Sequence, residues 1–379
     1  MRIMIIYGGF RPAKKYGGPV VSIENLVNFL DDTFWIVTRD HDWKSDEKLP
    51  GIHEGWNTFN DHTKVLYLAD SEHTKARYTE IIREIGPEVI YINGFYSIQM
   101  YVPMIRAAQK AGIPLLIAPR GTLNKNAMSL KSFKKYAYVS YMRMLIDKKK
   151  TYFQSTSEEE TERIGQLLGA STDHIIEVEN VPSIPKSSYS HPRKEKGSLK
   201  CCFFARICEK KNLLGAIRIL KNVKGNVEFN IYGNKEEVEY WEKCESEITE
   251  LPSNIHVEYR GAYDHSTVFE LMARNHVFLF PTLSENYGHV IVEAMLSGLP
   301  VIISDQTPWN DVNEAGAGYA IPLDQEIEYV EVINRYLEMG EEQYLQVVHS
   351  VEGYVGEKLS LDKLSKKYSD LFKQVIGQV

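Results

Sequence analysis

The strongest constraint on the fold of this chain is a regular alternation of short β-branched or aromatic runs with longer amphipathic stretches, beginning at the first residues. Such alternation is typical of βα units that build parallel sheets. In the first half, strands are predicted at residues 3–7, 34–38, 65–68, 89–93, 115–118 and 152–155. Helices are predicted at residues 20–30, 79–85 and 157–168. The last of these opens with a Ser-x-x-Glu capping box at Ser157 and Glu160.

The alternation stops at residues 183–198, which are rich in Pro, Ser and charged side chains, and we interpret this segment as an interdomain linker. It then restarts, with strands predicted at residues 201–205, 227–232, 255–259, 277–280 and 301–304. At 379 residues the chain also exceeds the roughly 250–300 residues that one hydrophobic core usually spans. We therefore predict an α/β protein with two doubly wound domains, residues 1–182 and 199–361. The final segment, residues 362–379, has apolar residues at helical spacing, so this helix must pack on another element.

Composition limits the class of function and the cellular compartment. A formal net charge of -7 disfavours nucleic acid as a principal partner, because neutralising many phosphates needs an excess of Lys and Arg. Two of the four cysteines, Cys201 and Cys202, are adjacent in a predicted buried strand, which is a poor geometry for disulfides, so reduced thiols are expected. No stretch approaches the about 20 apolar residues of a transmembrane helix, and the N-terminus lacks a signal-peptide pattern. A cytoplasmic protein is therefore expected.

The most informative segment for function is residues 281–305, PTLSENYGHVIVEAMLSGLPVIISD, which runs from a strand end through a polar turn and a helix to the next strand. It carries two glutamates, Glu285 and Glu293. One carboxylate could bind sugar hydroxyls and the other the diol of a nucleotide ribose. Two glutamates at this spacing could equally be solvated side chains of a turn and an exposed helix face.

A basic loop follows another predicted strand, where Arg206 is succeeded by Lys211 just before a helix. Ligands of open parallel sheets bind at the carboxyl ends of the strands, so this loop is a candidate site. A guanidinium can bind a diphosphate through two hydrogen bonds, a lysine adds a point charge, and the free amides of a helix N-terminus can point at phosphate oxygens. Alone, such a loop could also be an ordinary solvated strand end.

These motifs together resemble glycosyltransferase family 4, also called the group 1 glycosyltransferases. The resemblance implies that Glu285 contacts the donor sugar, that Glu293 holds the ribose, and that Arg206 and Lys211 grip the diphosphate. It also implies donor contacts in the turn at Asn286, Tyr287, Gly288 and His289, although His289 could equally be a partly buried structural histidine. The residues that carry the family signature are Ser284, Glu285, Gly288, Glu293, Ala294, Met295, Gly298, Pro300 and Val301.

Two looser matches lie in the first domain. Gly17 and Gly18 precede the first helix, and the resemblance places a glycine loop here near the donor phosphate and the acceptor; the alternative is a plain flexible turn. Arg120, in the sequence APRGT, resembles a subset of the family that has Pro-Arg-Gly where many members have a histidine near the donor sugar. We therefore include Arg120 among the candidate donor-binding residues.

Two further segments have competing interpretations. Asp40 and Asp42 form an Asp-x-Asp pattern of the kind that metal-dependent transferases of another fold use, but their place in a surface loop favours chance, and no metal site is predicted. Residues 131–150 interleave Lys and Tyr at helical spacing. That pattern suits a helix resting on an anionic membrane, and it suits equally an ordinary packed helix with a charged outer face.

Taken together, the resemblance implies a GT-B architecture, in which two Rossmann-like domains face one another across a cleft and the final helix packs back on the first domain. The N-terminal domain would bind the acceptor and the C-terminal domain the donor. The implied function is retaining transfer of a hexose from a UDP- or GDP-sugar to a glycan or lipid-linked acceptor, in surface polysaccharide or glycolipid assembly, at the inner face of the membrane, without cofactor or metal. The alternatives are a non-catalytic sugar-nucleotide-binding protein and a GT-B-like sugar-nucleotide epimerase.

Overall fold

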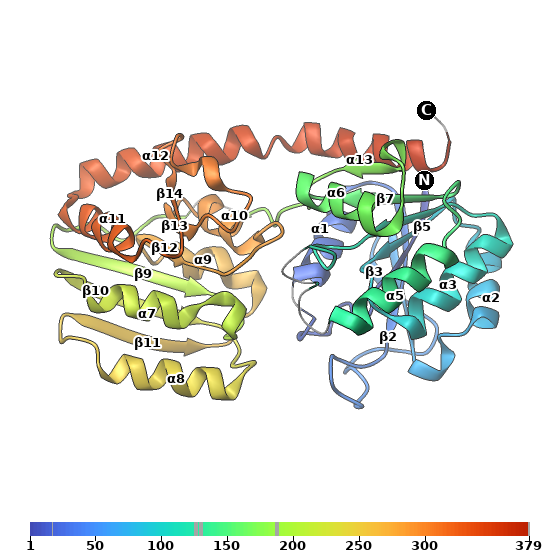
Figure 1. Ribbon diagram of the computed structural model, residues 1–379, viewed down its shortest axis with the longest axis horizontal. Helices are drawn as coiled ribbons and strands as arrows, with labels where there is room; N and C mark the ends of the chain where they lie inside the picture. Colours follow the sequence, from blue (N-terminus) through green and yellow to red (C-terminus); the bar gives the residue numbers. More distant parts are fainter. Residues whose placement is uncertain (17, 125–127, 129–131, 186–188, 378–379) are drawn as a thin grey trace. The chain divides into compact units, whose positions relative to one another are not determined.

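The computed structural model describes residues 1–16, 18–124, 128, 132–185 and 189–377 (Figure 1). The chain forms two compact units. Unit 1 contains residues 1–181 together with 361–379, and unit 2 contains residues 182–360.

Unit 1 is built on an eight-stranded sheet in the order β3-β4-β2-β1-β5-β6-β7-β8, parallel except for the antiparallel pair β3 and β4. Its strands are β1 (Arg2–Ile6), β2 (Thr33–Arg39), β3 (Trp56–Asn60), β4 (Thr63–Leu68), β5 (Val89–Asn93), β6 (Leu115–Ala118), β7 (Thr151–Ser155) and β8 (Ile175–Glu177). Its helices are α1 (Gly18–Phe29), α2 (Lys75–Ile85), α3 (Ile98–Ala111), α5 (Ser132–Leu145), α6 (Glu158–Leu168) and α13 (Leu361–Val375).

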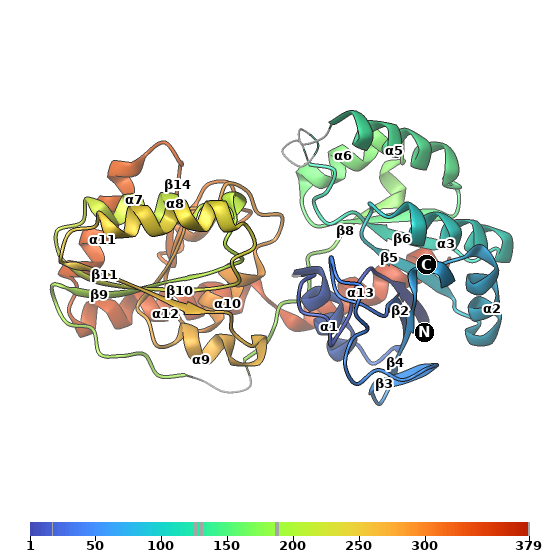
Figure 2. The ribbon, with the colours of Figure 1, turned by 90° about the horizontal axis from the view of Figure 1, so that it is seen from below.

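Helices cover both faces of this sheet, because alternate residues of a strand point to opposite sides. On β1, Ile3 and Ile5 face the cluster formed with α1 and α13, whereas Met4 and Ile6 face the cluster formed with α2 and α3. Figure 2 shows α1 on one side and α2 and α3 on the other. The apolar face predicted for the last helix is buried in the first of these clusters, and Tyr368 of α13 donates a hydrogen bond to the Glu179 carbonyl at 2.9 Å.

Unit 2 has a six-stranded, fully parallel sheet in the order β11-β10-β9-β12-β13-β14. In Figure 2, α7 and α8 lie on one face and α9 and α12 on the other. Its strands are β9 (Ser198–Phe204), β10 (Asn226–Tyr232), β11 (Ile255–Gly261), β12 (Val277–Phe280), β13 (Val301–Ser304) and β14 (Gly318–Ile321). Its helices are α7 (Leu213–Lys221), α8 (Val238–Thr249), α9 (Val268–Met272), α10 (His289–Leu296), α11 (Glu326–Glu338) and α12 (Glu341–Lys358).

The segment interpreted as a linker is tied to unit 2 near its end. Lys194 is almost fully buried, and its ammonium group donates to the carbonyls of Glu195 at 2.8 Å and Met339 at 3.0 Å. Burial lowers the pKa of Lys194. A buried ammonium needs such acceptors, so this part of the segment has a fixed position on unit 2. Residues 186–188 lie outside the described residues.

Candidate active site

The basic loop after β9 is held in place by Asn212. This residue adopts a left-handed conformation, with φ of 57°, and its side-chain oxygen accepts a hydrogen bond from the Gly215 N–H at 3.2 Å, which caps α7. Its side-chain amide donates to the Pro281 carbonyl at 2.7 Å. The loop that carries Lys211 is therefore fixed beside the end of β12.

Lys211 and Glu285, which are 74 residues apart in the sequence, form an ion pair in the structure. Their side chains are only 15% and 11% exposed, so the pair is largely shielded from water. Thr282 donates a longer hydrogen bond to the same carboxylate at 3.4 Å, and the Glu285 N–H donates to the Gln306 carbonyl at 2.9 Å. The structure thus brings together a cation suited to phosphate and a carboxylate suited to sugar hydroxyls.

Arg206 lies in the same loop, but its guanidinium points to a different partner. It forms an ion pair with Glu236 at 2.5 Å, and both side chains are nearly half exposed. Such an exposed pair contributes little stability, roughly 0–1 kcal/mol, so an anionic ligand can displace Glu236 at small cost.

Glu293 lies on α10 with its side chain 4% exposed. Its carboxylate accepts hydrogen bonds from His265 Nε2 at 2.8 Å and from the Ser183 hydroxyl at 3.2 Å. A carboxylate can only accept, so Nε2 of His265 carries the proton. Burial raises the pKa of Glu293, but the bonds from His265 and Ser183 and the nearby charges of His265 and His289 outweigh it, so the pKa lies below its ordinary value. The residue is therefore an ionised, oriented carboxylate.

The turn between the two glutamates is held by local contacts. Gly288 is the N-cap of α10 and has φ of 77°, a left-handed conformation that favours glycine. The Tyr287 carbonyl accepts a hydrogen bond from the indole N–H of Trp309 at 2.6 Å, and the rings of Tyr287 and His289 meet edge to face at 4.8 Å. The neighbouring Asn286 belongs to the same turn.

The glycine loop of unit 1 is organised by Asp42, the second member of the Asp-x-Asp pattern. Its carboxylate accepts backbone N–H groups from Lys14 at 2.9 Å and Lys15 at 3.0 Å. This gives Asp42 a structural role in the loop that leads into α1. Gly18 is the first residue of α1, and Gly17 lies outside the described residues.

Arg120, the other candidate in unit 1, points into that unit. Its guanidinium donates to Asn93 at 2.6 Å and forms hydrogen bonds with Tyr91 and Asn180. Its backbone has φ of 58°, a strained conformation for a residue with a Cβ. The next residue, Gly121, donates its N–H to the fully buried Glu160 at 2.5 Å. Ser157 caps α6 as expected, but Glu160 supports this turn, because its carboxylate accepts from Gly121 and Thr156.

Sequence reasoning missed several residues that shape the site. Asn212 and Trp309 position the motif loops, and His265 and Ser183 bind Glu293. The polar pair Asp264 and His265, in the loop that follows the predicted strand 255–259, was a usable signal for His265, whereas Ser183 carries none. Among the described residues, no group of three or more His, Cys, Asp or Glu side chains could hold a metal ion.

Residues 188–348 match the family model for glycosyl transferases group 1. This confirms the resemblance predicted from the motifs and identifies this part of the chain, within unit 2, as a group 1 glycosyltransferase domain. Assignment to family 4 in particular stays a prediction. No curated protein sequence has a significant match to the chain.

Solved structures similar to the whole chain share its two-unit α/β fold. Anabaena Alr3699/HepE, in complex with UDP and glucose, has a TM-score of 0.73 and 16% identity, covering 98% of this chain and 99% of that one. Sucrose-phosphate synthase from Thermosynechococcus elongatus has a TM-score of 0.72 and 14% identity over the full length of both chains. WaaG, a glycosyltransferase involved in lipopolysaccharide biosynthesis, has a TM-score of 0.67 and 15% identity, covering 98% of this chain and 99% of that one. The predicted GT-B class of fold is therefore confirmed.

Proposed function

We propose that the protein is a retaining glycosyltransferase that moves a hexose-type sugar from a nucleotide diphosphate sugar, a UDP- or GDP-sugar, to an acceptor. The observation that carries this proposal is the shielded ion pair of Lys211 and Glu285 at the carboxyl edge of the unit 2 sheet, in the same unit as the buried, ionised Glu293. The complexes of HepE with UDP and glucose and with UDP-glucose support a UDP-hexose as the first donor to test.

In the proposed reaction, the diphosphate of the donor takes the place of Glu285 beside Lys211, and the released Glu285 carboxylate binds sugar hydroxyls. The bond between the anomeric carbon and the phosphate oxygen breaks, and the acceptor oxygen bonds to the same face of that carbon. The proton of the acceptor passes to the leaving phosphate. Arg206 and Lys211 stabilise the charge that develops on the diphosphate, which is commonly the largest single contribution to such catalysis. Neither a cofactor nor a metal ion takes part in this scheme.

For the acceptor we propose a glycan or a lipid-linked sugar, bound by unit 1, in surface polysaccharide or glycolipid assembly in the cytoplasm. WaaG, which shares the fold, acts in lipopolysaccharide biosynthesis, and this supports a role of that type. In unit 1, we propose Gly17, Gly18 and Arg120 as donor-binding residues.

The test is incubation of the protein with UDP-, GDP- and ADP-sugars, with and without acceptor, followed by measurement of released nucleotide and sugar products. We expect release from one donor, its loss in Glu285→Ala and Arg206→Ala, and an unchanged rate in Glu245→Ala, an exposed glutamate of α8. The anomeric configuration of the product, read by NMR, should match that of the donor. A changed sugar nucleotide formed without acceptor would indicate an epimerase, and nucleotide binding without turnover a non-catalytic binder.

We also propose that α5 contacts the membrane surface. Its exposed side includes Phe133, Tyr136 and Met144, whose side chains are 85%, 46% and 79% exposed, and exposed cations at Lys134 and Arg143 flank them. Exposed apolar groups beside lysines suit an anionic interface, which accepts the rings while the charges stay at the headgroups. Lys131 lies outside the described residues. In the described part of the chain, no helix has the length and apolarity needed to cross a bilayer.

Vesicle co-sedimentation tests this contact. Binding to vesicles of phosphatidylcholine and phosphatidylglycerol should be lost in the double variant Phe133→Ser, Met144→Ser. It should persist in Ile327→Ser, which removes an equally exposed apolar side chain (77% exposed) from unit 2. Equal binding by both variants would remove α5 from the proposal.

A further inference from the structure

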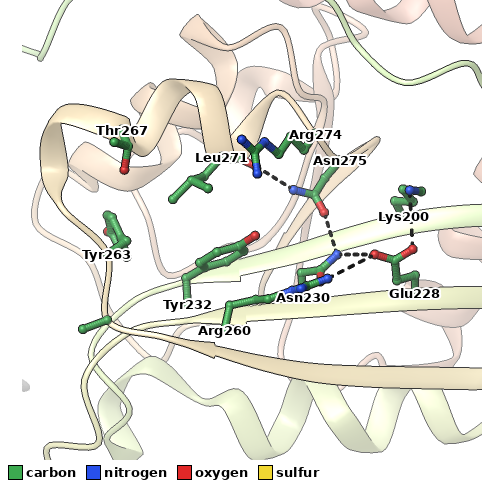
Figure 3. Close-up of a pocket in the computed structure, with 11 residues that line it drawn as sticks. Lys200, Glu228, Asn230, Tyr232, Arg260, Tyr263, Thr267, Leu271, Arg274 and Asn275 are labelled. Atoms are coloured by element: carbon green, nitrogen blue, oxygen red, sulfur yellow. Dashed lines mark hydrogen bonds and ion pairs between the residues drawn. The ribbon is translucent and has the colours of Figure 1, made fainter.

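Unit 2 contains a cavity on the α9 face of its sheet that the donor residues do not explain (Figure 3). The helix α9 has only five residues and spans roughly 8 Å, whereas β10 and β11 have seven residues each and span about 23 Å. The short helix therefore leaves part of these strands uncovered. The space is open to solvent and has a volume of about 400 Å³, which lies within the range of about 300–1,000 Å³ typical of small-molecule sites.

The described lining of this cavity includes three cations, Lys200, Arg260 and Arg274, and one carboxylate, Glu228. Each cation is ion-paired: Lys200 with Glu228 at 3.5 Å, Arg260 with Glu258 at 2.6 Å and Arg274 with Glu270 at 2.6 Å. The three cationic side chains are 41%, 39% and 62% exposed, and such exposed pairs contribute roughly 0–1 kcal/mol, so an anionic ligand can displace the glutamates at small cost.

The floor of the cavity is built from a saturated polar network. Asn230, only 4% exposed, accepts from Arg260 Nε at 2.9 Å and donates to Glu228 at 2.9 Å and to Asn275 at 3.1 Å. Lys200 lies 3.5 Å from the same Glu228. The bond from Asn230 and the charges of Lys200 and Arg260 outweigh burial and lower the pKa of Glu228, so this carboxylate is ionised and its charge is compensated. The side chains therefore have defined positions.

The lining of the cavity differs from the set of donor residues. Lys200 and Glu228 are the third residues of β9 and β10, well before the carboxyl ends of these strands, whereas Tyr232 is the last residue of β10 and Tyr263 follows β11, so the other end of the cavity reaches the carboxyl edge. Arg206, Lys211 and Glu285 are not among its described lining residues.

We propose that this cavity is a second ligand site that binds a small phosphate monoester with a sugar-sized organic part. Two guanidinium groups and an ammonium group match the oxygens of a phosphate, which arginine binds through paired hydrogen bonds. The volume exceeds what inorganic phosphate needs, and the hydroxyl groups of Tyr232 and Thr267 on the lining suit a polyol.

The experiment measures binding of glucose 6-phosphate to the full-length protein by calorimetry, with glucose as the uncharged comparison. We expect saturable binding of the phosphate ester and none of glucose. Arg260→Gln and Arg274→Gln should each weaken binding at least tenfold. Arg274 is 62% exposed, so its variant is expected to fold even if Arg260→Gln does not. Arg218→Gln, which changes an exposed arginine of α7 that also pairs with a glutamate, should bind as the unchanged protein does.

Lys211→Ala separates this proposal from the proposed donor site. If Lys211→Ala binds glucose 6-phosphate as the unchanged protein does, the cavity is supported as the binding site. If Lys211→Ala loses this binding, the ligand binds at the diphosphate site and the inference is overturned. Absence of saturable binding, or equal weakening by Arg218→Gln, would overturn it as well. None of these results depends on whether the enzyme transfers sugar.

Discussion

The two units use a cation after a strand in opposite ways. In unit 2, Lys211 pairs with Glu285, and an incoming phosphate can replace that one partner. In unit 1, the Arg120 guanidinium is divided among Tyr91, Asn93 and Asn180. Residue type and position in a βα unit are similar, yet one cation is available for exchange and the other is part of an internal network. The two residues differ in the number of side chains that bind them, and this number depends on the packing around each residue.

The largest effect is expected at the exchangeable pair. Lys211→Ala removes the charge proposed to stabilise the leaving diphosphate, so nucleotide release should fall by about 10²–10³-fold. Lys221→Ala, an exposed lysine at the end of α7, is the matched control and should keep the full rate. If Lys211→Ala releases nucleotide at a rate within a few-fold of that of Lys221→Ala, Lys211 is not the cation that stabilises the leaving diphosphate.

A substitution at Glu293 should affect both stability and its pH dependence. Glu293→Gln keeps the volume but weakens the bonds from His265 and Ser183, at a cost of roughly 1–3 kcal/mol. Because the folded pKa of Glu293 is lowered from 4.5, its stabilising contribution is complete above pH 4.5 and is lost as the pH falls through the folded pKa. Thermal unfolding of the unchanged protein and of Glu293→Gln should be measured from about pH 7 to about pH 3. The difference between their free energies of unfolding should shrink only at the acid end of this range. A difference that grows with acidity would contradict the assignment.

Arg120 tests the unit 1 half of the comparison. Arg120→Ala leaves buried polar groups without the guanidinium and should cost roughly 1–3 kcal/mol. Arg120→Gly removes the same group but relieves the backbone at φ of 58°, so it should be about 1 kcal/mol more stable than Arg120→Ala. Unfolding midpoints of the pair measure this difference. Because Arg120 is also a proposed donor contact, the activity of both folded variants should fall, whereas full activity would limit Arg120 to the internal network of unit 1.

The smallest effect is expected at Trp309. Trp309→Phe loses the indole hydrogen bond to the Tyr287 carbonyl, worth about 0.5–1.5 kcal/mol, and should raise KM for the donor a few-fold with little change in kcat. Trp241→Phe, at another buried tryptophan of the same unit, controls for lost ring volume. A kcat effect larger than the KM effect would mean that this turn does more than position the donor.

The accuracy of the strand predictions follows burial. Strands β5, β6, β12 and β13 have the predicted bounds, because each is a continuous apolar run that the parallel sheet buries on both faces. The three strands that were not predicted, β3, β8 and β14, all lie at sheet edges. Edge strands are short and partly exposed, so their sequences lack the apolar pattern that marks a central strand.

For the candidate site, local motifs identified Glu285, Glu293, Arg206 and Lys211, but not their arrangement. The contact of Lys211 with Glu285 joins residues far apart in the chain, and His265 lies 28 residues from Glu293. Such pairings depend on the order of β9, β11 and β12 in one sheet, which no local pattern encodes.

By itself, the sequence determined the alternation of strands and helices, the division into two α/β domains and the group 1 motif, because each of these depends on spacing along the chain. The tertiary structure alone decided that Lys211 faces Glu285 and that Arg120 is occupied by an internal network. It also decided that α9 is too short to cover β10 and β11, which leaves a cavity lined by ion-paired cations. These features depend on which side chains pack together across strands distant in sequence, and the free energy of each contact is set by burial and partners that exist only in the folded chain.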